Sequence, residues 1–339
     1  MNPTMDIAAL LPLIWAAIVG IAVAFYVILD GFDLGIGILF PLAKDDAERD
    51  RMLASIAPFW DGNETWLVLG GGGLLVAFPR AYSIVMPAFY LPLMIMLLAL
   101  VLRGVTFEFR AIAQRKPLWN AVFAGGSTLA GLCQGFVLGG FVQGVKIENG
   151  AYAGGPFDWA TPFGLLCGLG VVAGYALLGA CWLMLKTDGD MARRAAAKAK
   201  VLLAAVLVFM AAVSLYTPLT IPRIAQRWFA MPNLIYLAPV PIVTALIAFA
   251  EWRWIEARRD AAPFLASIAL FLLGYLGLAI STYPYIVPPT LTIQDAAAAP
   301  SSQLFMLIGT LVLLPLILGY TALTYWLFRG KVRDGAAYH

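Results

Sequence analysis

The stretch "LDGFDLGIGILFP" (residues 29–41) places two aspartates, Asp30 and Asp33, at the inner end of a long apolar segment. A charged side chain near the middle of a membrane costs about 2.5–3.5 kcal/mol. A chain that keeps two carboxylates there must either neutralise them or use them. The sequence therefore predicts a buried helix whose two carboxylates are either neutralised or used in function.

Helical spacing and small residues both act on this stretch. Positions i and i+3 share one face of a helix, so Asp30 and Asp33 point the same way. Gly31, Gly35 and Gly37 make the helix thin around them. We expect another helix or water to approach closely at this point.

The composition is that of a multi-span membrane protein. The chain has 339 residues, of which 62% are hydrophobic and 12% charged, and its mean hydropathy is +0.87. No polar or Pro-rich run marks a linker, which predicts one integral membrane domain over residues 1–339. The first basic residue is Lys44, so the N-terminus lacks the positive region of a cleaved signal peptide and the first span is expected to remain. The small net charge of +3 gives no case for a nucleic-acid partner.

Apolar runs of about 20 residues predict an all-α fold with nine transmembrane helices. The expected spans cover residues 7–40, 64–79, 82–103, 118–142, 161–185, 199–219, 232–252, 262–281 and 302–328. Most basic residues follow the odd-numbered spans, which leaves only Arg80, Lys146, Arg223 and Arg227 for the other side. By the positive-inside rule the N-terminus is periplasmic and the C-terminus cytoplasmic.

Further acidic and polar residues follow the first span. Asp61, Asn63, Glu64 and Trp66 stand where the chain re-enters the membrane. Carboxylates arranged from the cytoplasmic surface inward can relay protons, because each can accept and release one. This is one interpretation of the acids Asp30, Asp33 and Asp61.

Each of these residues also has a purely structural interpretation. Asp30 and Asp33 could anchor a helix end and pair with Arg103. Asp61 or Asn63 could cap the second helix by accepting from its first free N–H groups. Two further groups are expected to be structural: Glu108 with Arg110 as an interfacial ion pair, and residues 44–51 as a solvated charged loop.

The sequence is poor in the side chains that usually bind haem iron and transition metals. The only histidine is His339, so we expect the chain to bind no haem iron and no transition metal. Cys133, Cys167 and Cys181 are isolated in apolar sequence and are expected to be buried thiols. Two hypotheses remain: a cofactor-free subunit of a larger membrane complex that supplies a proton path, or a proton-coupled secondary transporter. The acids gather at one face and not around a midplane site, which favours the subunit.

Four motifs resemble subunit II of the bacterial cytochrome bd-type ubiquinol oxidases, a family that includes the cyanide-insensitive oxidase branch. The motifs are "DGFDLGIGILFP" (30–41), "SIAPFWDGNETWLVLGGGGLLVAFP" (55–79), "FYLPLMIMLLALVLRGVTFEFR" (89–110) and "YPYIVPPTLTIQDAAAAPSSQLFML" (283–307). The resemblance implies two four-helix bundles plus one peripheral helix in the bacterial cytoplasmic (inner) membrane. Gln294 stands where the family commonly has Trp.

The resemblance also implies partners and cofactors. The partner would be subunit I, which in this family holds two b-type haems, one d-type haem and the quinol-oxidation loop. The complex oxidises quinol, reduces O₂ to water with cytoplasmic protons and builds a proton-motive force without pumping. Some members carry a bound quinone in subunit II. Whether a small single-span accessory subunit is also present stays an open question.

Residue by residue, the resemblance assigns proton uptake to Asp30, Asp33 and Asp61. Arg103 matches an arginine that pairs with the first-helix acids, while Asn63, Glu64 and Glu108 are expected in support. Trp66 matches a position beside the apolar subunit interface, on a route for O₂.

Overall fold

The computed structural model describes residues 7–332, and most of them are helical. The helices are α1 (Ile7–Leu39), η1 (Phe40–Leu42), α2 (Asp46–Ile56), α3 (Trp60–Ala77), α4 (Pro79–Ala88), α5 (Tyr90–Ile112), α6 (Lys116–Gln143), α7 (Pro162–Lys186), α8 (Gly189–Thr220), α9 (Pro222–Phe229), α10 (Asn233–Leu237), α11 (Pro239–Glu256), α12 (Ala262–Thr282), α13 (Ile293–Ala296) and α14 (Pro300–Leu327). Two short antiparallel pairs complete the fold: β1 (Ile147–Glu148) with β2 (Ala151–Tyr152), and β3 (Tyr285–Val287) with β4 (Leu291–Thr292).

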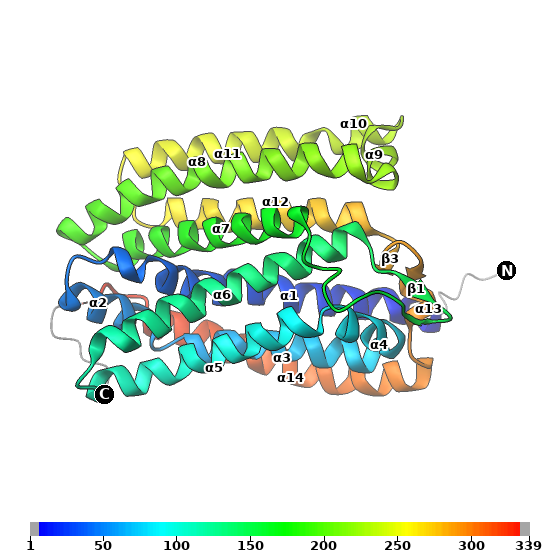
Figure 1. Cartoon of the computed structure of the whole chain (residues 1–339), viewed down its shortest axis with the longest axis horizontal. Coiled ribbons are helices and arrows are strands. Elements are labelled where there is room, and N and C mark those ends of the chain that lie inside the picture. The colour runs from blue at the N-terminus through cyan, green and yellow to red at the C-terminus, as the bar shows by residue number, and fades with distance from the viewer. Residues whose placement is uncertain (1–6, 333–339) are drawn as a thin grey trace.

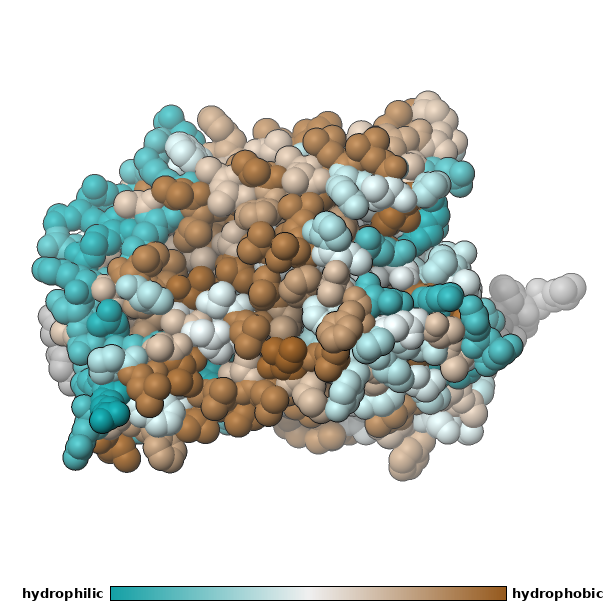
Figure 2. Space-filling model, in the orientation of Figure 1, coloured by the Kyte–Doolittle hydropathy of each residue, from teal (hydrophilic) through white to brown (hydrophobic). Residues whose placement is uncertain are grey.

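The long helices run side by side along the longest axis of the molecule (Figure 1). A broad hydrophobic band covers their middle, and hydrophilic residues gather at both ends (Figure 2). Within residues 7–332, eight helical segments are long and apolar enough to cross a membrane. They are α1 with η1, α5, α6, α7, α8, α10 with α11, α12 and α14. The chain is therefore a mainly helical, multi-pass membrane protein.

The expected second span, 64–79, corresponds to α3, which is not among these eight. The helix begins at Trp60, so its first turns contain Asp61, Asn63 and Glu64 and lower its apolar character. In Figure 1, α3 leads from the end where α2 lies toward α4 near the opposite end. The count of nine spans, the two four-helix bundles and the orientation stay predictions.

The third expected span, 82–103, is wrong as one helix. The structure divides it between α4 and α5, with Phe89 between them at φ −116° and ψ 22°. Pro87 lies near the end of α4 and has no N–H to continue the helical ladder, whereas Pro92 is tolerated in the first turn of α5.

Residues 44–51 are also not a simple solvated loop, because most of them form the start of α2. Asp45 caps this helix, and its Oδ1 accepts from the Glu48 N–H at 2.8 Å. Glu48 is buried and its carboxylate pairs with Arg194 at 2.6 Å. The charge run therefore forms the start of a helix at one end of the molecule, with Glu48 and Met52 on its buried face.

Helix α1 is the central element and packs against α3, α6 and α7. Its contact with α7 is a close backbone approach, since a Cβ added at Gly35 would lie 1.8 Å from the Tyr175 carbonyl oxygen. A Cβ at Gly37 would lie 1.9 Å from Ser127 Oγ on α6. The expected close approach at these glycines is confirmed, as is the burial of the three free cysteines.

We expect Gly35→Ala to lower the free energy of unfolding by about 1–3 kcal/mol, because an overpacked interface must shift its backbones. Thermal unfolding in a mild detergent measures the change. Gly274→Ala is the matched control, since a Cβ there meets no atom within 4 Å. Equal midpoints for the two variants would contradict the proposed packing role of Gly35.

Candidate functional site: a buried arginine among carboxylates

Arg103 on α5 is fully buried and lies among carboxylates from two other helices. Its Nη1 donates to Asp30 Oδ1 at 2.8 Å and to Glu64 Oε1 at 2.9 Å. Its Nη2 lies 4.0 Å from Asp33 Oδ2. Asp30, Asp33, Asn63, Glu64 and Arg103 are called the Arg103 cluster below.

The local fold explains why these groups meet. Asp30 and Asp33 share one face of α1, as their spacing predicts. Trp60, the first residue of α3, stacks on Phe107 of α5 with centroids 4.7 Å apart, which holds the start of α3 against α5. Gly126 of α6 lets α5 approach, because a Cβ there would lie 2.9 Å from the Ala99 carbonyl oxygen.

Asn63 joins the cluster to the last helix. Its Nδ2 donates to Asp33 Oδ2 at 2.7 Å and to the Leu29 carbonyl oxygen at 3.2 Å. Tyr325 of α14 donates from its hydroxyl to Asn63 Oδ1 at 3.0 Å. Tyr325 could not be predicted from the sequence, because a single tyrosine in an apolar span carries no signal of its own.

A second polar chain leads from the cluster between α1, α6 and α7. Tyr26 lies one helical turn before Asp30, and its hydroxyl accepts from Gln134 Nε2 at 2.9 Å. The Tyr175 hydroxyl donates to Gln134 Oε1. These residues were not among the predicted site residues, although Gln134 gives a signal as a polar side chain in an otherwise apolar segment.

The charges of the cluster do not balance when every acid is ionised. One guanidinium faces three carboxylates, which leaves two surplus negative charges. Asp30 Oδ2 and Asp33 Oδ1 are buried and have no hydrogen-bond partner among the described residues. Uncompensated charge in an apolar interior is costly, and a proton on either oxygen offsets it. Glu64, whose side chain is 27% exposed, connects the cluster to the surface.

Asp61 lies outside this hydrogen-bonded group. Its side chain is exposed near the start of α3, and residues 7–332 offer its carboxylate no hydrogen bond or ion pair. The capping interpretation of Asp61 and Asn63 is wrong, because the N-cap is Phe59 and no side chain caps the helix. Asn63 instead points toward α1.

The expected ion pair between Glu108 and Arg110 is also wrong. Residues two apart do not face each other on a helix, and Glu108 is exposed. Arg110 is buried and pairs with Asp50 of α2 at 2.5 Å, while its Nε donates to Asn120 Oδ1 at 2.6 Å. Arg110 therefore fastens α2 to α5 and α6.

Comparison with known proteins agrees with the resemblance of the motifs. The family model for cytochrome bd terminal oxidase subunit II matches residues 11–328. The chain belongs to this family. A member in Escherichia coli K12, "Cytochrome bd-I ubiquinol oxidase subunit 2", is 30% identical over 368 residues, which cover 94% of each chain. In Bacillus subtilis, "Cytochrome bd ubiquinol oxidase subunit 2" is 27% identical over 330 residues, covering 94% of this chain and 96% of that one.

A solved structure shows the same fold. The bd oxidase from Geobacillus thermodenitrificans contains a chain that matches with a TM-score of 0.74 at 20% identity, over 94% of this chain and 98% of that chain. Membership of the bd oxidase subunit II family places the chain in an oxidoreductase complex of aerobic respiration, together with a partner subunit.

Trp66 lies one turn after Asn63 on α3 and is buried. It stacks on Phe25 with centroids 4.5 Å apart and packs in a small group with Ala22 and Tyr26. Its Nε1 has no hydrogen-bond partner among the described residues. The expected position beside the partner subunit stays a prediction.

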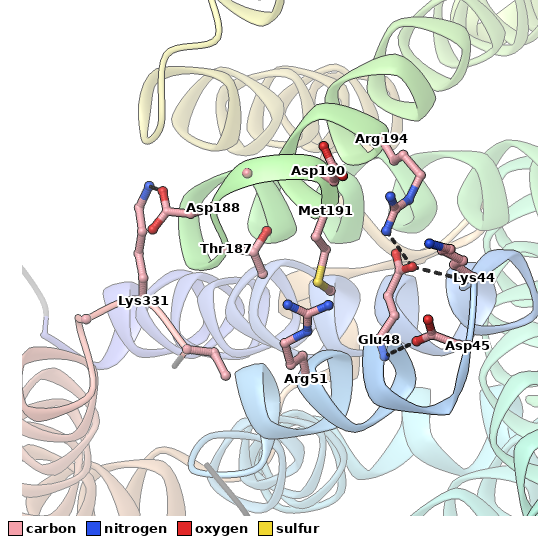
Figure 3. A pocket seen from close by; sticks show the side chains of 13 residues that line it. Lys44, Asp45, Glu48, Arg51, Thr187, Asp188, Asp190, Met191, Arg194 and Lys331 are labelled. Atoms are coloured by element: carbon pink, nitrogen blue, oxygen red, sulfur yellow. Dashed lines mark hydrogen bonds and ion pairs between the residues drawn. The ribbon is translucent and has the colours of Figure 1, made fainter. Parts of the chain in front are cut away.

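A separate pocket of about 780 Å³ lies at the end of the molecule that carries α2, and none of the predicted site residues line it (Figure 3). Glu48 and Arg194 form an ion pair at 2.6 Å on one side, and Asp188 and Lys331 form another at 2.6 Å on the other. Since acids and bases alternate around the pocket, it presents no net charge that would select a charged ligand.

The described part of the chain contains no group of three or more His, Cys, Asp or Glu side chains placed to hold a metal ion. His339 lies outside residues 7–332. A bound quinone in this chain stays a prediction without assigned residues.

We expect Arg103→Met to destabilise the protein by about 3–5 kcal/mol, because it leaves buried carboxylates without their cation. Adding Asp30→Asn should recover part of this loss by removing one of those charges. Thermal unfolding of both variants in detergent, with each single substitution, gives the coupling energy. Arg115→Met is the control, since Arg115 is exposed and has no side-chain partner among the described residues. Purely additive effects would mean that Arg103 and Asp30 act independently.

Proposed function

We propose that this chain is the haem-free subunit II of a bd-type quinol oxidase and that its Arg103 cluster lies on the uptake path for cytoplasmic protons. The observation that carries the proposal is the placement of Asp30, Asp33 and Glu64 around one buried arginine. Such an arrangement can gain and lose protons without moving helices, because the guanidinium offsets part of the charge that remains.

The acidic side chains can be ordered along the proposed proton path from the surface inward. Asp61 is the outer acid and Glu64, three residues later, is partly exposed and touches Arg103. Asp30 Oδ2 and Asp33 Oδ1 are the buried oxygens free to take the proton inward. Asn63 donates to Asp33 at 2.7 Å, and Tyr325 in turn donates to Asn63 at 3.0 Å and holds it in place.

The proposed topology has nine spans in the bacterial inner membrane: the eight apolar segments described above and α3. The N-terminus is periplasmic and the C-terminus is cytoplasmic. Two four-helix bundles and one peripheral helix make up the single integral membrane domain. The distribution of basic residues supports this orientation. It puts the end that carries α2 and the Figure 3 pocket in the cytoplasm.

The chemistry of the complex belongs to the partner in this proposal. Subunit I holds two b-type haems and one d-type haem, oxidises quinol at the outer face and reduces O₂ to water. Subunit II contributes protons and an apolar interface that includes Trp66, and charge separation generates the proton-motive force. The alternative of a proton-coupled secondary transporter loses its support, because residues 11–328 match the family model of an oxidase subunit.

A visible difference spectrum, dithionite-reduced minus oxidised, tests the division of labour. We expect no haem bands from this chain purified alone in mild detergent, and haem bands when it is purified with its co-expressed subunit I. Haem bound by the lone chain would show that the inference from its single histidine is wrong. A stable lone chain with no haem in either sample would argue against the oxidase complex.

Asp61→Asn should slow quinol-driven O₂ consumption by roughly tenfold, or about 1.4 kcal/mol of barrier, while assembly with subunit I is retained. The reason is that an amide keeps the shape of Asp61 but cannot carry its proton. Glu148→Gln is the control, because Glu148 is also exposed but lies in β1 at the opposite end. Wild-type turnover of a correctly assembled Asp61→Asn complex would remove Asp61 from the path.

A further inference from the structure

Another buried carboxyl lies far from the Arg103 cluster along the chain, on α11. Glu251 has 0% exposure, although α11 lies at the periphery of the molecule (Figure 1). It lies five residues before the end of α11, which is about 7.5 Å along the helix axis. Neither the motifs nor the proposed proton path uses this residue.

Neighbouring helices satisfy only one oxygen of Glu251. Ser267 of α12 donates from its hydroxyl to Oε1 at 2.6 Å, and the Cys181 thiol of α7 lies 3.8 Å from the same oxygen. Oε2 is buried and has no hydrogen-bond partner among the described residues. The site therefore supplies donors to one oxygen and no hydrogen-bond partner among the described residues to the other.

No salt bridge joins Glu251 to a basic side chain within residues 7–332, and two lysines of the neighbouring helices α7 and α8 have other partners. Lys200 of α8 pairs with Glu256 at 3.1 Å and lies over the Trp252 ring. Lys186 of α7 donates to the Phe328 and Gly330 carbonyl oxygens. Helix α12, which supplies Ser267, contains no charged residue. The remaining ionisable group in contact is the Cys181 thiol itself.

We propose that Glu251 is a second proton-binding site, in which the carboxyl is held as the neutral acid with its proton on Oε2. An ionised carboxylate without a cation is far more costly in an apolar interior than a hydrogen-bonded neutral acid. Ser267 and Cys181 orient the group by donating to Oε1, which leaves Oε2 to carry the proton.

The site differs from the Arg103 cluster in charge and in location. Three acids share one arginine in that cluster, whereas Glu251 has no ionic partner and lies among α7, α11 and α12. The proposal does not depend on oxidase activity, so it can fail or succeed separately from the proposed function.

Infrared spectroscopy tests the proposal on the full chain in mild detergent at neutral pH. The spectrum of Glu251→Gln should lack one carbonyl band of a protonated carboxylic acid, which then appears as a loss in the difference spectrum against wild type. In wild type, that band should shift when the solvent is D₂O. Glu256→Gln is the matched control, since Glu256 lies on the same helix but is exposed and paired with Lys200. A folded Glu251→Gln variant with an unchanged band region would overturn the proposal.

Labelling of the wild-type chain keeps the test decisive if Glu251→Gln does not fold. Dicyclohexylcarbodiimide adds to a protonated carboxyl without a leaving group, so the labelled peptide gains the whole mass of the reagent. We expect this adduct on Glu251, with a yield that falls as the pH is raised. Absence of the adduct at every pH, with no acid carbonyl band assignable to Glu251, would refute the site.

Discussion

The contact between Arg103 and the carboxylates of α1 and α3 is the constraint on which the rest of this half of the molecule depends. A guanidinium with 0% exposure requires anions at hydrogen-bond distance, and Asp30 and Glu64 supply them at 2.8 and 2.9 Å. Removing Arg103 leaves carboxylate charges that the apolar surroundings cannot solvate. Three helices are thereby held in one register.

Small residues make that contact geometrically feasible. Carboxylates in the middle of a packed bundle need neighbouring backbones close enough to exclude lipid, and Gly35 and Gly37 bring α7 and α6 against α1. Polar side chains then complete the network from distant parts of the sequence, since Tyr325 reaches Asn63 and Gln134 reaches Tyr26. The cluster is therefore specified by packing as much as by charge.

Much of this arrangement could be predicted from the sequence, where the signal was local or chemical. The spacing of Asp30 and Asp33, the glycines beside them and the lone arginine of an apolar segment indicated a buried ion pair. Contacts made across the bundle carried no such signal. Arg110 pairs with Asp50 of α2, because helix geometry turns it away from Glu108. Asn63 donates to Asp33 of α1 and does not cap its own helix. The division between α4 and α5 was missed because hydropathy averages over a proline-induced break.

The two buried acid sites show two ways in which one membrane chain can keep carboxyl groups away from water. In the Arg103 cluster, the guanidinium compensates one carboxylate, so bound protons need to neutralise only the surplus negative charge. At Glu251 no cation is present among the described residues, so a single proton is the means of compensation, and its loss would require the helices to admit water. The arrangement at Arg103 suits rapid exchange of protons, and the arrangement at Glu251 suits retention of one proton. A chain whose partner carries the redox centres can contribute to proton uptake through such carboxyl chemistry alone, because the positions of helices and one arginine set which oxygens hold protons.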